Sequence, residues 1–298
     1  LLHWSMRYVD VFAPDILAAR EELALLETLD MGAPIARTST YKRWIVQALR
    51  FYGGQAVALA FDRIAHITRV MSAHHPTSDL GRIAHAQAGE VLRLDADTVH
   101  VLSAAQHWAR ISGGAFNPCL AAQTLSRQHQ RPGVAGPAKG NLNDLHIRSA
   151  TEVALTQAVQ LDLGGIAKGY AVDCAIEVLR AHGVTDALVN AGGDLRAIGS
   201  RHWRVDVRHA NTCLMDGRVT RKKHLHGQAL ATSVAGPLSP EFVRTRRRQK
   251  LTWQSVSIEA DSCMVADVLT KWALQASLLC PDLRAALREN RGRMWRSQ

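Results

Sequence analysis

The segment of residues 161–173 constrains the fold more than any other part of the chain. It reads LDLGGIAKGYAVD. The apolar residues at 159–163 are typical of a buried strand, and Gly164 and Gly165 interrupt it as a turn. Apolar residues at helical spacing then predict a helix over 166–182. A strand, a glycine turn and a helix are therefore expected in immediate succession.

This turn suits a phosphate group. Two glycines allow a ligand to approach the backbone closely, and the N–H groups in the first turn of a helix attract an anion. Lys168 adds a positive charge one turn into the predicted helix. The pattern is neither GxGxxG nor the P-loop pattern, so neither nucleotide fold has its signature. The spacing alone leaves both a phosphate site and an ordinary turn with a solvated lysine open.

Two further segments are candidates for a site. Asn190, Gly192, Gly193 and Asp194 follow directly after a strand predicted at 187–189, which indicates either a ligand site at a sheet edge or a tight turn. Asp267 is a carboxylate on an otherwise apolar helix that Ser262 is expected to cap.

The chemistry of that aspartate is open at this point. A buried carboxylate is costly unless it is hydrogen-bonded or bound to a cation, and a hard oxygen ligand suits Mg²⁺. An aspartate that faces solvent or caps a neighbouring group is the alternative interpretation of Asp267.

Further elements follow from periodicity and from residues that start or end helices. The expected helices are residues 15–31, residues 56–71 and a helix capped by Asp97 and ended by Gly113 and Gly114; the expected strands are 203–207 and 255–258; and 121–145 and 210–250 are expected to be irregular.

Charge and cysteine content exclude several classes of protein. The 298 residues carry a formal net charge of +10, which favours anionic partners, but the basic runs at 221–223 and 244–250 lack interleaved aromatic residues and read as solvated loops. We therefore expect no nucleic-acid partner. The five cysteines are scattered without CxxC spacing, so neither a disulfide framework nor a zinc site is expected. Nor is there an apolar run of about 18 residues that could cross a membrane.

Two resemblances to known families divide the chain. Residues 1–54 look like an N-terminal helical fragment of an aldehyde dehydrogenase, and we interpret them as a remnant without dehydrogenase activity. Residues 55–298 resemble the FAD:protein FMN transferase family, also called ApbE, because DLGGIAKGYAVD and VNAGGDLRA occur in the family's order and spacing. Matching shorter motifs are GGAFNP at 113–118, ATS at 231–233 and AD at 266–267. The expected fold is α+β, a mixed helix and sheet flavin transferase domain with an extra N-terminal helical segment.

The resemblance implies Mg²⁺-dependent transfer of FMN from FAD to a Ser or Thr hydroxyl of a target flavoprotein, with AMP released. By motif, the residues implied for FAD are Met71, His74, Ala115, Phe116, Asn117, Asp162, Lys168, Asn190, Gly192, Gly193 and Asp194. Those implied for Mg²⁺ are the carbonyl of Gly165, the carboxylate of Asp267 and a hydroxyl four residues later, where Lys271 stands beside Thr270.

The chain departs from the family pattern at several points. His74 stands where a Tyr is frequent, Asn117 replaces an Asp, and Lys271 replaces the hydroxyl ligand. The family's His-Ile-Ile-Asp-Pro-x-Thr-Gly stretch is absent between Ser233 and Ser255, so no catalytic residue is assigned. An FAD- and Mg²⁺-binding protein without turnover is therefore the alternative. Family members are often periplasmic or attached to the outer face of the cytoplasmic membrane, whereas the chain as it stands shows no signal peptide and reads as cytoplasmic.

Overall fold

The computed structural model describes residues 54–73, 75–119, 140–208, 219–234, 255–277 and 280–297. In chain order the elements are α4 (Gly54–Val70), α5 (Asp79–His85), β1 (Val91–Arg93), α6 (Ala96–Ile111), the 3-10 helix η1 (Leu142–Asp144), β2 (Leu145–Ile147), β3 (Glu152–Leu155), α8 (Ala167–Ala181), β4 (Ala187–Ala191), β5 (Asp194–Ile198), β6 (Trp203–Arg208), β7 (Val219–Leu225), β8 (Ala229–Val234), β9 (Ser255–Ala260), α9 (Cys263–Gln275), α10 (Pro281–Glu289) and β10 (Arg293–Ser297).

A five-stranded antiparallel sheet is the centre of the fold. Its strands lie in the order β10, β9, β8, β5, β4, and two smaller antiparallel sheets accompany it, β1-β3-β2 and the β6-β7 hairpin. All pairings are antiparallel and the helices connect separate parts of the sheet system, which confirms the α+β expectation.

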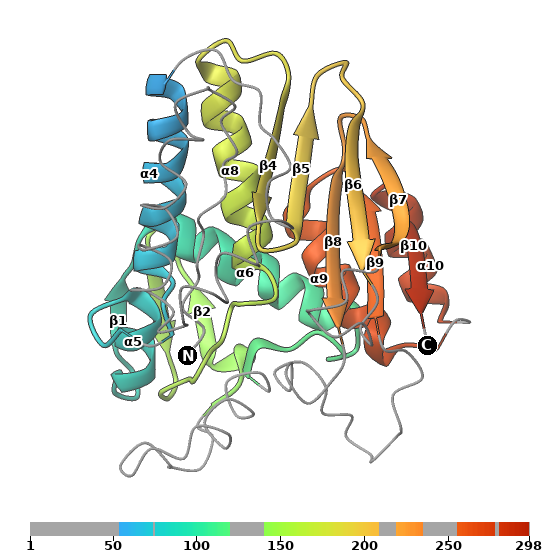
Figure 1. Ribbon diagram of the computed structural model, residues 1–298. Helices are drawn as coiled ribbons and strands as arrows, with labels where there is room; N and C mark the ends of the chain where they lie inside the picture. Colours follow the sequence, from blue (N-terminus) through green and yellow to red (C-terminus); the bar gives the residue numbers. More distant parts are fainter. Residues whose placement is uncertain are drawn as a thin grey trace, which may run out of the picture.

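Two helices cover one face of the large sheet. Helix α8 packs on β4 and β5, α9 packs on β8 and β9, and the two helices contact each other. Helix α4 lies along the outer side of α8, so the layers run from sheet through α8 and α9 to α4 (Figure 1). The apolar faces of all three helices are buried in one continuous core. This packing sets the positions of the helix ends and of the loops that begin there.

Local signals place most of these elements where the sequence predicts them. Ser262 Oγ accepts the Val265 N–H at 3.2 Å and starts α9, as expected. Gly113 and Gly114, with φ of 59° and 81°, follow the end of α6. The predictions of α4, α8, β4, β6 and β9 are confirmed to within three residues at each end.

Three predictions of local structure are wrong. The cap of α6 is Asp95, whose Oδ1 accepts the Asp97 N–H at 2.9 Å, because Asp95 has the extended backbone that a cap requires. Val159, Leu161 and Leu163 are buried in the core, but residues 159–163 join no ladder of the described sheets. The stretch predicted to be irregular at 210–250 contains β7 and β8.

Part of the predicted structure lies outside the described chain. The helix expected at 15–31 lies outside it, as do 209–218 and 235–254, and within 121–145 the structure has η1 and the start of β2. Four cysteines in the described part, Cys119, Cys174, Cys263 and Cys280, are free thiols. No helix among the described residues is long and apolar enough to cross a membrane.

Candidate functional site

The glycine turn and the C-terminal helix meet through the contact between α8 and α9. A Cβ on Gly169 would lie 2.3 Å from the Cys263 carbonyl oxygen, so only glycine allows α8 to approach the first turn of α9 this closely. The Asp173 carboxylate accepts the N–H groups of Cys263 and Met264, both at 2.9 Å, and thereby caps α9 from a neighbouring helix. This contact holds Lys168 on α8 and Asp267 on α9 at one place.

A β-hairpin brings the third segment to the same place. Gly192 and Gly193, with φ of 66° and 104°, form the two-residue turn between β4 and β5, and the Asn190 side chain accepts the Gly193 N–H at 3.0 Å. Asp194 follows at the start of β5 and is only 1% exposed. Its Oδ2 pairs with Lys168 Nζ at 2.8 Å. The turn and the ligand-site interpretations of this segment are therefore compatible.

Asp267 forms a second ion pair, with Lys271, and the hydroxyls of Ser233 and Thr270 lie beside it. Its side chain is fully buried, and Oδ1 accepts a hydrogen bond from Lys271 Nζ at 2.6 Å. The same ammonium lies 2.5 Å from Ser233 Oγ on β8 and 3.3 Å from Thr270 Oγ1. Ser233 and Thr270 are hydrogen-bonded to each other at 2.6 Å. The solvent-facing interpretation of Asp267 is thus wrong.

We call Lys168, Asp194, Asp267 and Lys271 the carboxylate–ammonium cluster. Burial raises the pKa of Asp194, the charge of Asp267 raises it further, and the two ammonium groups oppose the shift. Burial lowers the pKa of Lys168, but the charges of Asp194 and Asp267 outweigh burial and raise it above its ordinary value. The two ion pairs therefore interact as one group of four charges.

A hydrogen bond to the side chain of Asp162 stabilises the turn before α8. Asp162 Oδ1 accepts the Gly164 N–H at 2.8 Å, and a Cβ on Gly164 would lie 3.0 Å from that oxygen. Gly165 is buried in the same turn. Ile166 at the N-cap offers no side-chain hydrogen bond to α8, so within the described structure the N-terminal N–H groups of this helix are not capped by a side chain at that position.

A family model described as the ApbE family matches residues 31–236. The chain belongs to the ApbE family. A protein named FAD:protein FMN transferase from Treponema pallidum (strain Nichols) is 35% identical over 199 residues, which are 60% of this chain and 54% of that protein. One of the same name from Rhodobacter capsulatus is 42% identical over 103 residues, 34% of this chain and 19% of that protein. The chain thus spans about half of the first relative and less of the second.

A solved structure shows the same fold. The flavinyl transferase ApbE of Pseudomonas stutzeri, in its apo form, superimposes with a TM-score of 0.66 at 21% identity, and the match covers 82% of each chain. This likeness confirms the mixed helix and sheet architecture of an ApbE domain.

Four residues that the resemblance implies for the flavin have contacts within the described fold: Met71, Ala115, Phe116 and Asn117. Phe116 and Met71 are each 4% exposed and belong to the core. Ala115 accepts a hydrogen bond from Gln275 on α9 at 2.7 Å through its carbonyl oxygen. Asn117 Oδ1 accepts the Cys119 N–H at 3.0 Å, so it has a local capping contact. His74 lies outside the described residues.

The residues around Asp267 do not fit the divalent cation implied by the ApbE resemblance. Mg²⁺ lies about 2.1 Å from each oxygen ligand and requires near-octahedral coordination. Here the ammonium of Lys271 already contacts the Asp267 carboxylate and both hydroxyls that surround it. Oδ2 of Asp267 is left as a buried oxygen without a hydrogen-bond partner in the described structure, so a divalent ion here would have to share the Asp267 carboxylate with the ammonium.

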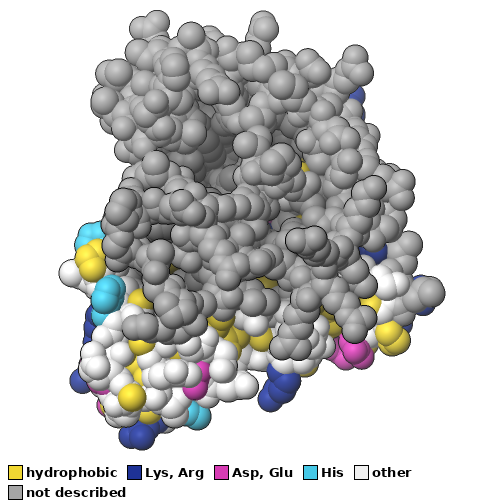
Figure 2. Space-filling view, turned by 90° about the horizontal axis from the view of Figure 1, so that it is seen from below, with side chains coloured by type: hydrophobic (Ala, Val, Ile, Leu, Met, Phe, Trp, Pro, Cys, Tyr) yellow, Lys and Arg dark blue, Asp and Glu magenta, His cyan; other side chains and the backbone are white. Residues whose placement is uncertain are grey.

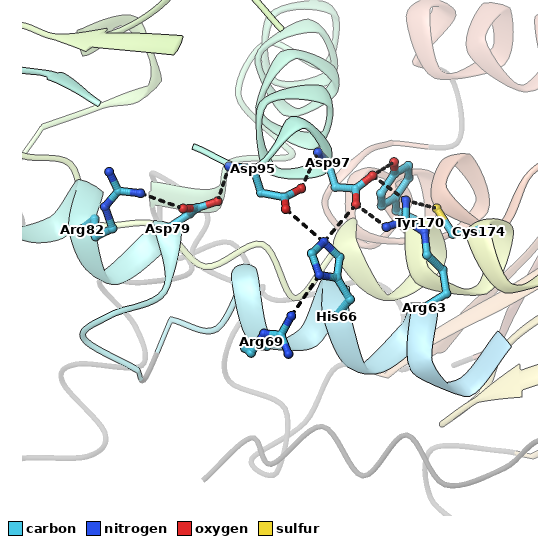
Figure 3. Close-up of polar contacts among 9 residues, drawn as sticks. All are labelled: Arg63, His66, Arg69, Asp79, Arg82, Asp95, Asp97, Tyr170 and Cys174. Atoms are coloured by element: carbon cyan, nitrogen blue, oxygen red, sulfur yellow. Dashed lines mark hydrogen bonds and ion pairs between the residues drawn. The ribbon is translucent and has the colours of Figure 1, made fainter. Parts of the chain in front are cut away.

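A second polar group lies outside these motifs. His66, Asp95 and Asp97 place three potential metal ligands within 4.8 Å of one another. Arg63 forms hydrogen bonds with both oxygens of Asp97, and Tyr170 donates to its Oδ1 at 2.6 Å, as Figure 3 shows. These contacts compensate the carboxylate and tie α4 to α6 and α8, so the group has a structural role.

Figure 2 shows the molecule from below, and the described Lys and Arg side chains on this face lie at separate points rather than in one patch. Among the described residues, the exposed large apolar side chains are Leu59 and Val91.

Two residues of this site were missed as candidates by the sequence analysis. Ser233 stands in a motif that carried the resemblance, but only the pairing of β8 with β9 places its hydroxyl beside Thr270. Asp173 ends the LDLGGIAKGYAVD segment, and its capping of α9 depends on a contact between residues 90 positions apart. No periodicity signal could have found either role.

Proposed function

We propose that this chain transfers FMN from FAD to a Ser or Thr hydroxyl of a target flavoprotein and releases AMP. One observation carries the proposal: motifs from three separate parts of the chain converge on the carboxylate–ammonium cluster, where Lys168 on α8 pairs with Asp194 at 2.8 Å. Membership of the ApbE family and the printed names of its relatives support the same activity.

The chemistry needs positioning and neutralisation of charge more than covalent assistance. The acceptor hydroxyl oxygen forms a bond to the FMN phosphorus while the bond from that phosphorus to the bridging oxygen breaks, AMP takes that oxygen, and the hydroxyl proton passes to a base or to water. The N-terminus of α8 and Lys168 supply positive potential for the pyrophosphate. Gly164 and the Gly192–Gly193 turn let backbone approach the ligand.

The resemblance implies a magnesium ion held by Gly165, Asp267 and a hydroxyl, whereas the contacts of Lys271 argue against a divalent ion at that position.

Covalent flavin transfer is directly measurable. The full chain is incubated with FAD and a flavoprotein domain that carries an acceptor Thr, and the products are separated on a denaturing gel and read by flavin fluorescence. We expect fluorescence on the acceptor, and none on an acceptor with Thr→Val. Lys168→Met should abolish the signal, whereas Lys222→Met, at an exposed lysine of β7, should leave it unchanged.

The second candidate is FAD binding without turnover. It is favoured by the absence of the family's histidine-containing stretch between Ser233 and Ser255. Saturable FAD binding by the chain, with no fluorescence on any acceptor, would establish this alternative and contradict the transferase.

A further inference from the structure

Lys271 is buried in a set of oxygen atoms that would suit a metal ion. Its side chain is 5% exposed, although a lysine is long enough to reach solvent from most positions. Its Nζ contacts the Asp267 carboxylate and the hydroxyls of Ser233 and Thr270. Three donors of an ammonium thus face three oxygens, and hard oxygen atoms of this kind are also the ligands that Mg²⁺ and Mn²⁺ prefer.

We propose that the ammonium of Lys271 is the resident cation of this site and that the chain binds the FAD pyrophosphate without a divalent metal ion. The inference rests on the proposed function for the identity of the ligand. It also makes a claim about the protein alone, because a site already filled by an ammonium should have little affinity for a divalent ion whether or not FAD binds.

Charge balance supports this assignment. The carboxylate–ammonium cluster contains two carboxylates and two ammonium groups, all close enough for the charges to interact. Removal of Lys271 would leave one buried negative charge in excess, and burial of an uncompensated carboxylate is costly. A divalent ion placed beside Lys271 would instead add two positive charges, and Oδ2 is the one oxygen of the Asp267 carboxylate left without a hydrogen bond in the described structure.

The first experiment uses a metal alone. Mn²⁺ has the oxygen preference of Mg²⁺ and is followed by electron paramagnetic resonance as free ion is lost from solution. We expect weak Mn²⁺ binding to the parent chain and about tenfold or tighter binding to Lys271→Thr, which replaces the ammonium with a third hydroxyl. Lys222→Thr, the same change at an exposed lysine, should bind Mn²⁺ as the parent does. Tight stoichiometric Mn²⁺ binding by the parent chain and equally by His66→Ala, which removes a ligand of the His66, Asp95 and Asp97 group, would overturn the proposal, even if Lys271→Thr fails to fold.

The second experiment tests the ligand. FAD is titrated into parent and Lys271→Thr protein in EDTA and in Mg²⁺, with quenching of flavin fluorescence as the readout. We expect the parent's Kd to change by less than about threefold between the two buffers, and that of Lys271→Thr to weaken by about tenfold in EDTA and recover in Mg²⁺. A parent that binds FAD only with Mg²⁺ contradicts the resident cation. A parent that binds no FAD in either buffer contradicts the proposed function, and the Mn²⁺ measurement still decides the role of Lys271.

Discussion

Gly169 lies directly against the backbone of Cys263, so close that a Cβ at Gly169 would meet the Cys263 carbonyl oxygen at 2.3 Å. The next nearest atoms to such a Cβ are the Cys263 carbonyl carbon and Met264 Cα, which also belong to the backbone. No side-chain rotation can relieve such a contact. The separation of α8 from α9, and with it the distance between the two ion pairs of the site, therefore depends on one missing methyl group.

Gly169→Ala should be strongly destabilising for this reason. Alanine favours a helix by about 1 kcal/mol, but forced displacement of α9 should cost about 3 kcal/mol more than that gain. Gly183→Ala at the other end of α8 is the control. Its φ is 78° and an added Cβ meets nothing within 4 Å, so the loss there should be about 1 kcal/mol. Urea unfolding of both variants measures the difference, and equal losses would disprove the steric role.

Asp173→Asn should weaken the start of α9. The carboxylate receives two backbone N–H groups and pairs with Arg196 at 2.8 Å, and an amide has only one oxygen to offer. We expect a loss of about 2 kcal/mol in the free energy of unfolding. Asp261→Asn removes an exposed pair with Arg291 and should cost less than about 1 kcal/mol. Comparable losses at the two positions would argue against the cap.

Asp267→Asn tests the second ion pair. It would leave the ammonium of Lys271 buried without its carboxylate, which should cost about 3 to 5 kcal/mol. The double variant Asp267→Asn/Lys271→Met removes both charges and should recover a large part of that loss. A thermodynamic cycle from urea unfolding gives the coupling energy. If the loss in the double variant equals the sum of the losses in Asp267→Asn and Lys271→Met, the two side chains are not coupled.

The pKa of Asp97 predicts an acid-sensitive contact between helices. Burial raises this pKa, but the hydrogen bonds from Arg63 and Tyr170 lower it by a larger amount. The pKa of Asp97 is therefore below its ordinary value of 3.8. A carboxyl with a lowered pKa in the folded state contributes stability above its unfolded pKa, and the contribution is lost as the pH falls through the folded pKa. Asp97→Asn should therefore be less stable than the parent at about pH 6, with the difference shrinking toward about pH 3. A pH-independent difference would exclude the ionised pair.

Local signals in the sequence located α4, α8 and the start of α9 but not the contacts between these helices. Ser262 caps α9 by accepting the N–H of Val265, three residues later in the chain. The local sequence pattern is therefore enough to identify this helix start. Residues 159–163 show why a buried apolar run is ambiguous, because Val159 and Leu163 are buried by the core without any strand partner. Burial by tertiary packing and burial within a sheet produce the same run of apolar letters.

The candidate site shows the same limit. Lys168, Asp194 and Asp267 were identified from three motifs, but their pairing depends on how α8, α9 and the β4-β5 hairpin are stacked. Lys271 could be recognised only as a departure from a pattern. Its role needs the position of Ser233, 38 residues earlier on another element.

The two-residue turn at Gly192 and Gly193 makes this region sensitive to chain length as well as to residue type. Ala191 and Asp194 face each other across the hairpin, so no spare residue lies between the strands. Side chains alternate between the two faces of a strand, and one inserted residue after Gly193 would shift the register and turn Asp194 away from Lys168. Relatives that retain this ion pair should therefore exclude single-residue insertions and deletions from the hairpin.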